Sequence, residues 1–435
     1  MSGHLNKQKI CRDFLLPFVF SIGVMLSVDT LAMLGNFLGK TGYSGFLLIF
    51  LSAIIYLELL FQYKQLFNLF PGYSTDIEIV KDILGTIPGL FLFFVKIIAV
   101  IFLSTGLLVS SGFVFNEVFL YWFPNFAFAF ILLGLLLGLQ FLPDKAKLFF
   151  QIGFVGISIF GLLFLIIAGI IQTDPIIPTK SGGIDYAFMT TKLNILFLPL
   201  LLFIGFDLGF IGCNKSRELD SLRYNSIFSA VFFMCILFVL WGIISLANVT
   251  PQKLTSTTIP HMIAARNILG DIGRFTMGII VISGSLAFVH TLFTVISKQG
   301  TIISKTIRLP KNINGSKILI LSITLIIAGL MAAGLAGEEK LETFIRASLI
   351  LWMISYTIMS LSYIISLSRP AQKKHINILF SKTKSLIFLL ILVICILILI
   401  GTDDQSVLIV KFIGLSFLTS FILGIVFAYR DINGR

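Results

Sequence analysis

Twelve apolar segments recur along the whole chain, each close to the length needed to cross a lipid bilayer. A membrane-spanning helix needs about 20 mostly apolar residues. Charged residues make up 12% of the 435 residues, about half the share usual in soluble proteins. The sequence therefore predicts an all-α integral membrane protein with twelve transmembrane helices, near residues 14–34, 44–66, 88–119, 126–142, 148–171, 194–213, 224–247, 274–297, 316–336, 343–367, 385–401 and 406–429.

Lysine and arginine residues gather on one side of the predicted membrane. If the N-terminus is inside, most of the 32 basic residues fall in inner segments, above all in SKTIRLPKNINGSK and SRPAQKKHINILFSKTK. Cytoplasmic loops carry such an excess. We therefore predict a multi-pass protein of the cytoplasmic (inner) membrane, with both termini cytoplasmic and residues 1–13 as a short tail. The scattered basic residues account for the net charge of +12 without a nucleic-acid partner.

Sequence motifs of common enzymes and pumps do not occur in this chain. There is no HExxH, no GxSxG and no GxxxxGK[ST], which argues against a metalloprotease, a serine hydrolase and an ATP-driven pump. The four cysteines show neither CxxC nor metal-ligand spacing. We predict no enzyme activity, no catalytic residues, no metal site and no cofactor, so the expected partners are the lipid bilayer and a small-molecule substrate.

Two apolar segments carry the same interruption. Pro17 to Gly23 and Pro199 to Gly205 both read P-x-x-x-x-I-G, and both glycines fall near the middle of their predicted spans. Proline and glycine free backbone groups from the helix ladder, which lipid tolerates only where protein or water surrounds them. Matched interruptions in two halves of a chain indicate broken helices around a midplane site. The alternative is an ordinary kink at a glycine used for close packing.

Asp207 follows the second interruption by two residues. A carboxylate near the bilayer centre costs about 2.5–3.5 kcal/mol on insertion scales, so it is expected to face a cavity, a partner or a proton. Three roles are open: binding a substrate amine, carrying a coupling proton, or accepting the free N–H groups of the broken helix. Asp29, six residues after Gly23 and nearer the outer face, is a candidate for coupling or gating; the alternative is a carboxylate that looks into a wet vestibule.

Other polar residues inside the spans are candidates for coupling or gating. Glu58 and Lys96 lie at similar depths in neighbouring spans, as a structural ion pair or as an inner gate or proton site. Ser283 and Ser285 could supply hydroxyl ligands to a cation or substrate, or bond back to their own helix. His290 could shuttle protons, or hydrogen-bond across a helix interface.

The stretch from Phe203 to Asp207, FIGFD, resembles the amino acid–polyamine–organocation (APC) transporter superfamily, many members of which carry F-x-G-F-[DE] in the sixth span. SIGVM, from Ser21 to Met25, is similar to that family's first-span G-S-G-I-F. The resemblance implies a LeuT-like fold of five plus five inverted helices, with helices 1 and 6 broken and two helices appended. It implies a division into 14–171 (first repeat), 172–367 (second repeat) and 368–435 (two additional helices).

The resemblance also implies a substrate site between the two broken helices. It places Ser21, Ile22 and Gly23, with Val24 beside them, around a carboxylate through backbone N–H groups. It places the carbonyls of Ile204, Gly205 and Phe206 around an amine, with Phe206 as an aromatic lid. This chain has serine where the family's first glycine stands and isoleucine where its serine stands, so carboxylate binding at the first span stays open.

We therefore predict a secondary active transporter that moves amino acids or related amines by alternating access, as an ion-coupled symporter or an exchanger. The alternative is a ligand-sensing membrane subunit of the same fold that does not transport. The sequence leaves open proton or sodium coupling, symport or exchange, and the oligomeric state.

Overall fold

The computed structural model describes residues 2–70, 72–73, 75–172, 193–211, 220–306, 315–334, 340–368 and 378–433. Within these ranges every regular element is a helix, as predicted. Nine helices are long and apolar enough to cross a membrane among the described residues, and three shorter apolar helical segments accompany them at Phe14–Met25, Asn125–Gln140 and Ile195–Phe210. Within the described ranges each of the twelve predicted segments falls on helical elements, and the first and sixth are interrupted.

The first half of the chain holds the helices α1 (Ser2–Met25), α2 (Val28–Thr41), η1 (Gly42–Ser44), α3 (Gly45–Leu69), α4 (Asp76–Leu84), α5 (Thr86–Val118), α6 (Asn125–Gln140) and α7 (Asp144–Gln172). The second half holds α9 (Leu193–Phe197), η2 (Leu198–Phe203), α10 (Leu208–Ile211), α11 (Asp220–Asn248), α12 (Pro251–Ser256), α13 (Pro260–Thr306), α14 (Gly315–Ala332), α15 (Lys340–Ser366), α16 (Ile378–Gly401) and α17 (Ser406–Asn433). The predicted division at 171/172 and 367/368 falls beside undescribed segments and stays a prediction.

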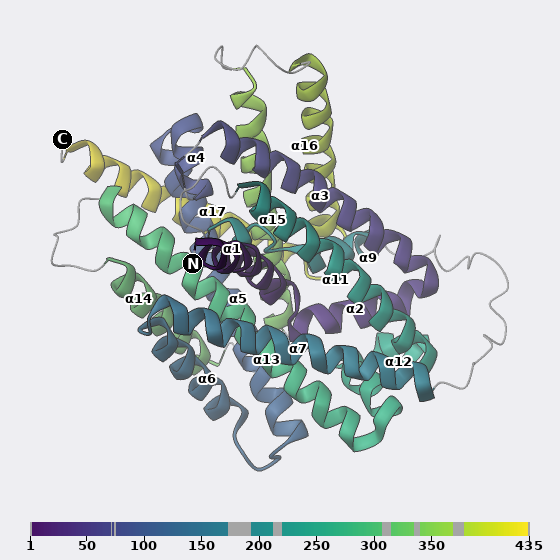
Figure 1. The fold of residues 1–435 in the computed structure, drawn as a ribbon. Helices are drawn as coiled ribbons and strands as arrows, with labels where there is room; N and C mark the ends of the chain where they lie inside the picture. The colour runs from purple at the N-terminus through teal and green to yellow at the C-terminus, as the bar shows by residue number, and fades with distance from the viewer. Residues whose placement is uncertain are drawn as a thin grey trace.

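Burial separates central helices from peripheral ones. The apolar windows of α5 and α13 are 83% and 89% buried, whereas those of α7, α14, α16 and α17 are each 33% buried. Large apolar side chains on the peripheral helices stay exposed, as at Phe160 on α7 and Leu415 on α17, which suits contact with lipid. In Figure 1, α1 lies near the middle of the view, with α5, α11, α13 and α15 around it.

The first span is broken at Leu26 and Ser27, between α1 and α2. Ser27 is extended, with φ −131° and ψ 172°, and its side chain accepts a hydrogen bond from the Thr30 N–H. This capping starts a new helix. We expected the break at Gly23, and that position was wrong: the Leu26 N–H still bonds to the Ile22 carbonyl at 3.1 Å. Gly23 serves packing instead, because a Cβ there would lie 2.3 Å from Gln151 Nε2.

The sixth span is broken at Ile204 to Asp207, where the sequence predicted it. A 3₁₀ helix ends at Phe203, Ile204 is extended, and α10 begins only at Leu208. Gly205 has φ +95°, a conformation that residues with a Cβ rarely adopt. A Cβ at Gly205 would also lie 2.1 Å from Val24 Cγ1. Glycine is thus required twice, by the turn and by the contact with the first span.

Candidate functional site

The carboxylate of Asp207 lies at the sixth-span break and is 1% exposed. Its Oδ2 lies 3.0 Å from Lys96 Nζ on α5. Its Oδ1 accepts hydrogen bonds from the Tyr356 hydroxyl at 2.8 Å and from Trp352 Nε1 at 3.3 Å. Two helices, α5 and α15, therefore hold this carboxylate, which supplies the partners that a buried charge requires.

Lys96 joins Asp207 to a second buried carboxylate, Asp76 at the start of α4. Lys96 Nζ donates to Asp76 Oδ2 as well as to Asp207 Oδ2, and all three side chains are about 1% exposed. Asp76 Oδ1 accepts from the Ile77 N–H at 3.0 Å and from Gln299 Nε2 on α13 at 3.3 Å. This Asp76–Lys96–Asp207 cluster carries two negative charges and one positive charge away from water.

Tyr356 links the cluster to the backbone of the break. Its hydroxyl accepts from the Gly205 N–H at 2.9 Å and donates to Asp207 Oδ1 at 2.8 Å. The Gly205 N–H lost its helical partner at the break, so this bond satisfies a buried donor that would otherwise cost about 1–3 kcal/mol. Asp207 thus secures the broken helix through Tyr356 rather than by accepting N–H groups directly.

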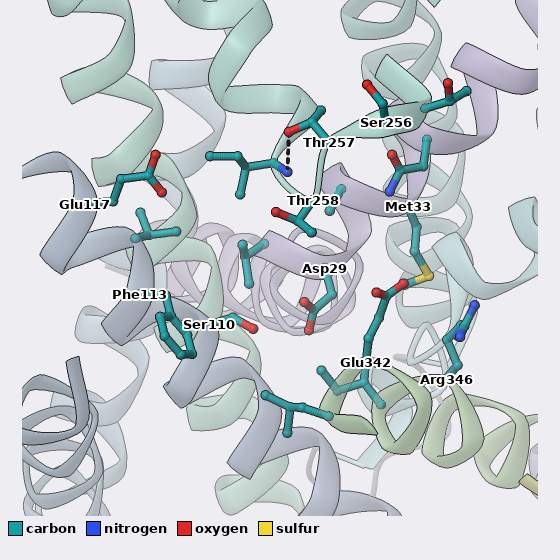
Figure 2. A pocket seen from close by; sticks show the side chains of 18 residues that line it. Asp29, Met33, Ser110, Phe113, Glu117, Ser256, Thr257, Thr258, Glu342 and Arg346 are labelled. Carbon is teal, nitrogen blue, oxygen red and sulfur yellow. Dashed lines mark hydrogen bonds between the residues drawn. The ribbon is translucent and has the colours of Figure 1, made fainter. Parts of the chain in front are cut away.

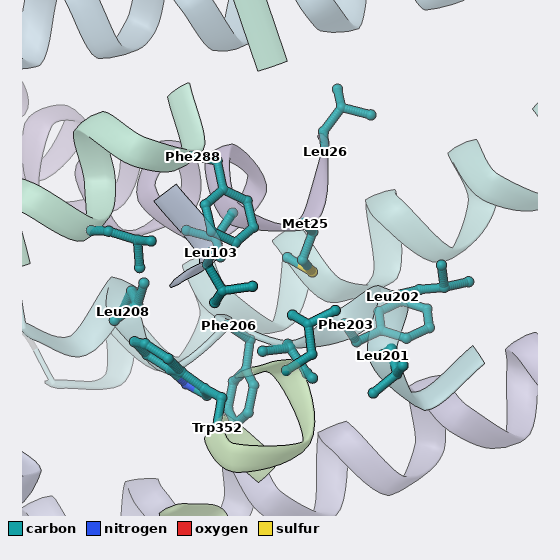
Figure 3. Packing of buried hydrophobic residues seen from close by; sticks show 14 of the residues in the cluster. Met25, Leu26, Leu103, Leu201, Leu202, Phe203, Phe206, Leu208, Phe288 and Trp352 are labelled. Atoms are coloured by element: carbon teal, nitrogen blue, oxygen red, sulfur yellow. The ribbon is translucent and has the colours of Figure 1, made fainter. Parts of the chain in front are cut away.

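Aromatic side chains fill the space around the break. The Phe206 ring lies edge-on to the rings of Tyr56 and Tyr63, with centroids 5.5 and 5.7 Å away, and 5.4 Å from Tyr356. Phe206 is 0% exposed. Figure 3 shows it with Leu103 and Trp352 among the side chains packed there. In this conformation Phe206 is part of a packed wall, and the role of lid stays a prediction.

The first-span residues named by the resemblance do meet the sixth span. Ser21 Oγ donates to the Phe206 carbonyl at 2.9 Å, and Val24 contacts Gly205. However, Ser21, Ile22 and Gly23 lie inside α1, so their N–H groups belong to a continuous helix. This conformation therefore presents no N–H cradle for a carboxylate at these three residues.

A cavity of about 560 Å³ reaches from the protein surface to Asp29. In Figure 2, Asp29, Ser110 and Glu342 point into it from α2, α5 and α15. Glu117 and Arg346 also line it, and Arg346 is paired with Asp403 at 3.3 Å. A further space of only about 10 Å³ lies between Asp29 and Ile204, room for about one water molecule. Asp29 therefore lies in a vestibule that stops short of the sixth-span break.

The expected pairing of Glu58 with Lys96 was wrong. Glu58 bonds to Lys384 at 2.7 Å at the protein surface, with exposures of 20% and 52%. Lys96 instead turns toward Asp76 and Asp207. Similar depth along two helices does not fix which faces meet, because each residue further along turns the side chain by about 100°.

The three coupling candidates on α13 differ in their hydrogen bonds: Ser283 and His290 bond to α7, and Ser285 has no partner among the described residues. Ser283 Oγ donates to the Phe154 carbonyl of α7 at 2.9 Å. His290 Nδ1 lies 2.7 Å from Gln151 Oε1, which also belongs to α7. Ser285 Oγ is buried with no hydrogen-bond partner among the described residues. None of the three lines the vestibule.

Four site residues were missed from the sequence: Asp76, Gln299, Trp352 and Tyr356. A signal existed for Asp76, because Thr75 and Glu78 form a capping box that starts α4, and T-x-x-E predicts such a helix start. Trp352 and Tyr356 are four residues apart, so they share one helix face. No group of three or more His, Cys, Asp or Glu side chains suited to a metal ion occurs in the described ranges.

Comparison with solved structures finds membrane transporters of similar fold. The manganese transporter of Eremococcus coleocola in complex with an aromatic bis-isothiourea compound is 13% identical, with a TM-score of 0.53, over 96% of this chain and 95% of that one. A mutant of that transporter gives 14% identity and a TM-score of 0.57, over 99% and 97%. A Na⁺-coupled sialic acid symporter gives 11% identity and a TM-score of 0.61, over 87% and 88%.

Neither the models of protein families nor the curated protein sequences give a match. At identities of 11–14% the structural likeness establishes the fold alone. The chain has the all-helical, LeuT-like membrane fold of these transporters.

Proposed function

We propose that this chain is a secondary active transporter that moves amino acids or related amines by alternating access around its two helix breaks. The observation that carries the proposal is the buried Asp207 at the sixth-span break, secured by Lys96 and Tyr356 and packed against the first span. Buried intramembrane charges are expensive and are usually retained for function.

The arrangement of open and closed regions supports alternating access. The vestibule at Asp29 opens to one side of the molecule, the space between Asp29 and Ile204 narrows to about 10 Å³, and Asp207, three residues further on, is 1% exposed. With both termini cytoplasmic, the vestibule faces outward and the cluster lies toward the cytoplasm. The conformation is then one in which the inner path is closed.

The charges of the vestibule favour an amine on the substrate. Asp29, Glu117 and Glu342 line it, whereas its one lining cation, Arg346, is already paired with Asp403. The structural neighbours handle manganese and sialic acid, so the fold does not choose among substrates.

Matched local features support the inverted repeat proposed for 14–171 and 172–367. Each half has a broken first helix, and in each a short helix ends at a glycine with positive φ before a long central helix. In the first half α4 ends at Gly85, φ +106°, before α5. In the second, α13 is interrupted at Gly270, φ +60°, after its first turns. The appended helices α16 and α17 lie at the periphery.

Uptake into proteoliposomes tests the proposal. A panel of labelled amino acids and amines is offered with a proton gradient, a sodium gradient or internal unlabelled substrate. Accumulation of one class by the wild type, lost in Asp207→Asn but kept in the surface control Glu58→Gln, is the expected result. Ligand binding by thermal shift without any uptake would favour the alternative, a sensing subunit of the same fold, and would refute transport.

A further inference from the structure

His290 is a buried histidine with one ring nitrogen free. It lies on α13 and is 0% exposed. Its Nδ1 lies 2.7 Å from Gln151 Oε1 on α7, an amide oxygen that can only accept, so Nδ1 carries the proton. Its Nε2 has no hydrogen-bond partner among the described residues. The neutral ring therefore keeps an unused lone pair inside the protein.

The partner of His290 forms the surface on which the first span packs. Gln151 Nε2 donates to Thr291 Oγ1 at 2.8 Å and to the Ala287 carbonyl at 3.2 Å. A Cβ at Gly23 would lie 2.3 Å from Gln151 Nε2 and 3.2 Å from Thr291 Oγ1, so only glycine lets α1 approach this closely. The first span is thus tightly packed against Gln151, the partner of His290, and against Thr291, its neighbour in the chain.

This contact is continuous with the helix breaks. On α1, Gly23 stands between Ser21, which bonds to the Phe206 carbonyl, and Val24, which contacts Gly205. A movement of α1 that opens the sixth-span break must therefore also change the packing at Gln151 and His290.

The contact holds one basic nitrogen that can take a proton. The Gln151 atom nearest Gly23 is Nε2, whose N–H groups are bonded to Thr291 Oγ1 and to the Ala287 carbonyl, so it offers no lone pair to a cation. Three nearby hydroxyls each donate their hydrogen to a carbonyl: Ser283 to that of Phe154, Ser158 to that of Ile280 and Thr291 to that of Ala287. The lone pair on His290 Nε2 belongs to a basic nitrogen with no hydrogen-bond partner among the described residues, so it can accept a proton.

The charged surroundings of His290 are sparse. Lys147 on α7 is the charged side chain that acts on it. The neighbouring helices contribute uncharged groups, Gly23 from α1 and Gln140 from α6, which bonds to Thr294. The Asp76–Lys96–Asp207 cluster reaches α13 at Gln299, about 14 Å further along the helix.

We infer that His290 carries the coupling proton: it is neutral while α1 packs on Gln151, and it is protonated when α1 moves away and water reaches Nε2. An imidazolium in the closed contact would bring a second N–H without an acceptor and a buried charge, which is costly. Proton binding and the packing of α1 thus exclude each other, so a proton shifts the balance between conformations. The inference rests on the proposed transport function.

The test compares His290→Gln with His261→Gln in proteoliposomes. Glutamine retains a donor for Gln151 but does not titrate. His261 is a matched control, since it is 1% exposed on α13, before the interruption at Gly270, and neither ring nitrogen has a partner among the described residues. We expect His290→Gln to keep exchange of labelled for unlabelled substrate but to lose at least tenfold of the accumulation driven by a proton gradient. His261→Gln should accumulate like the wild type.

Other outcomes separate the two proposals. Wild-type accumulation driven by sodium alone, or full proton-driven accumulation by His290→Gln, would overturn the role of His290 and leave transport standing. No uptake or exchange by the wild type would count against transport itself.

Hydrogen exchange gives a second readout that needs no substrate. After correction for intrinsic rates, peptides covering 14–25 and 287–294 of the wild type should exchange several-fold faster at pH 5.5 than at pH 8. His290→Gln should show no such change, and equal exchange of the wild type at both pH values would refute the inference.

Discussion

Replacing Tyr356 with phenylalanine removes one oxygen atom that serves two buried groups. The hydroxyl accepts from the Gly205 N–H at 2.9 Å and donates to Asp207 Oδ1 at 2.8 Å, and Tyr356 is 0% exposed. A hydrogen bond to a charged group contributes about 1.5–3 kcal/mol, and a buried donor left without a partner costs about 1–3 kcal/mol. Asp207 keeps Lys96 and Trp352, so we expect a combined loss of about 2–4 kcal/mol in the free energy of unfolding.

Two other tyrosines provide graded controls for Tyr356→Phe. Tyr56 makes one bond, to the Leu200 carbonyl at 2.7 Å, so Tyr56→Phe should cost about 1 kcal/mol. Tyr363, on the same helix as Tyr356, reaches only Ser381 Oγ at 3.4 Å, and Tyr363→Phe should cost less than about 1 kcal/mol.

Titration with sodium dodecyl sulfate in mixed micelles, followed by tryptophan fluorescence, measures these differences. In a double-mutant cycle, Tyr356→Phe and Asp207→Asn should be non-additive, because Asp207→Asn replaces the charged acceptor of the Tyr356 hydroxyl by a neutral one. A Tyr356→Phe variant no less stable than Tyr56→Phe, or additive with Asp207→Asn, would refute the idea that Tyr356 latches the broken helix.

The same structure makes further predictions for single substitutions. Lys96→Met leaves Asp76 and Asp207 buried together without their cation, so it should lower the free energy of unfolding by about 3–5 kcal/mol, as measured by the same titration. Adding Asp76→Asn should restore part of that stability, and a double variant no more stable than Lys96→Met would contradict the cluster. Gly23→Ala puts a Cβ 2.3 Å from an amide nitrogen and should lower the free energy of unfolding by about 1–3 kcal/mol through overpacking. Gly134→Ala, where a Cβ would have nothing within 4 Å, should be tolerated. Equal losses of stability in the two variants would contradict the close approach of α1.

Much of the membrane fold could be predicted because lipid imposes it on the sequence. A spanning helix needs a long apolar segment, and each such segment can be recognised in the sequence by itself. The sixth-span break could also be predicted, since Pro199, Gly205 and Asp207 each disfavour a continuous helix at that depth. Gly205 does adopt a positive φ at this break.

The position of the first-span break and the partners of Lys96 could not be predicted from the sequence, and the reasons are physical. A glycine in a helix serves either a turn or a close approach, and Gly23 serves the second. From its depth alone, Lys96 could pair with any carboxylate at a similar level. The orientation of each helix about its own axis turns Lys96 toward Asp76 and Asp207 and away from Glu58. That orientation depends on how the helices pack against one another, and a local sequence pattern does not predict it.

Counterflow in proteoliposomes tests the central claim most directly. Vesicles loaded with unlabelled substrate are diluted into labelled substrate without any ion gradient, so that only a carrier whose site faces each side in turn concentrates the label. The account predicts a transient overshoot of label with the wild type and none with Asp207→Asn. Label that only equilibrates in wild-type vesicles, or an undiminished overshoot with Asp207→Asn, would contradict a carrier whose site lies at the sixth-span break.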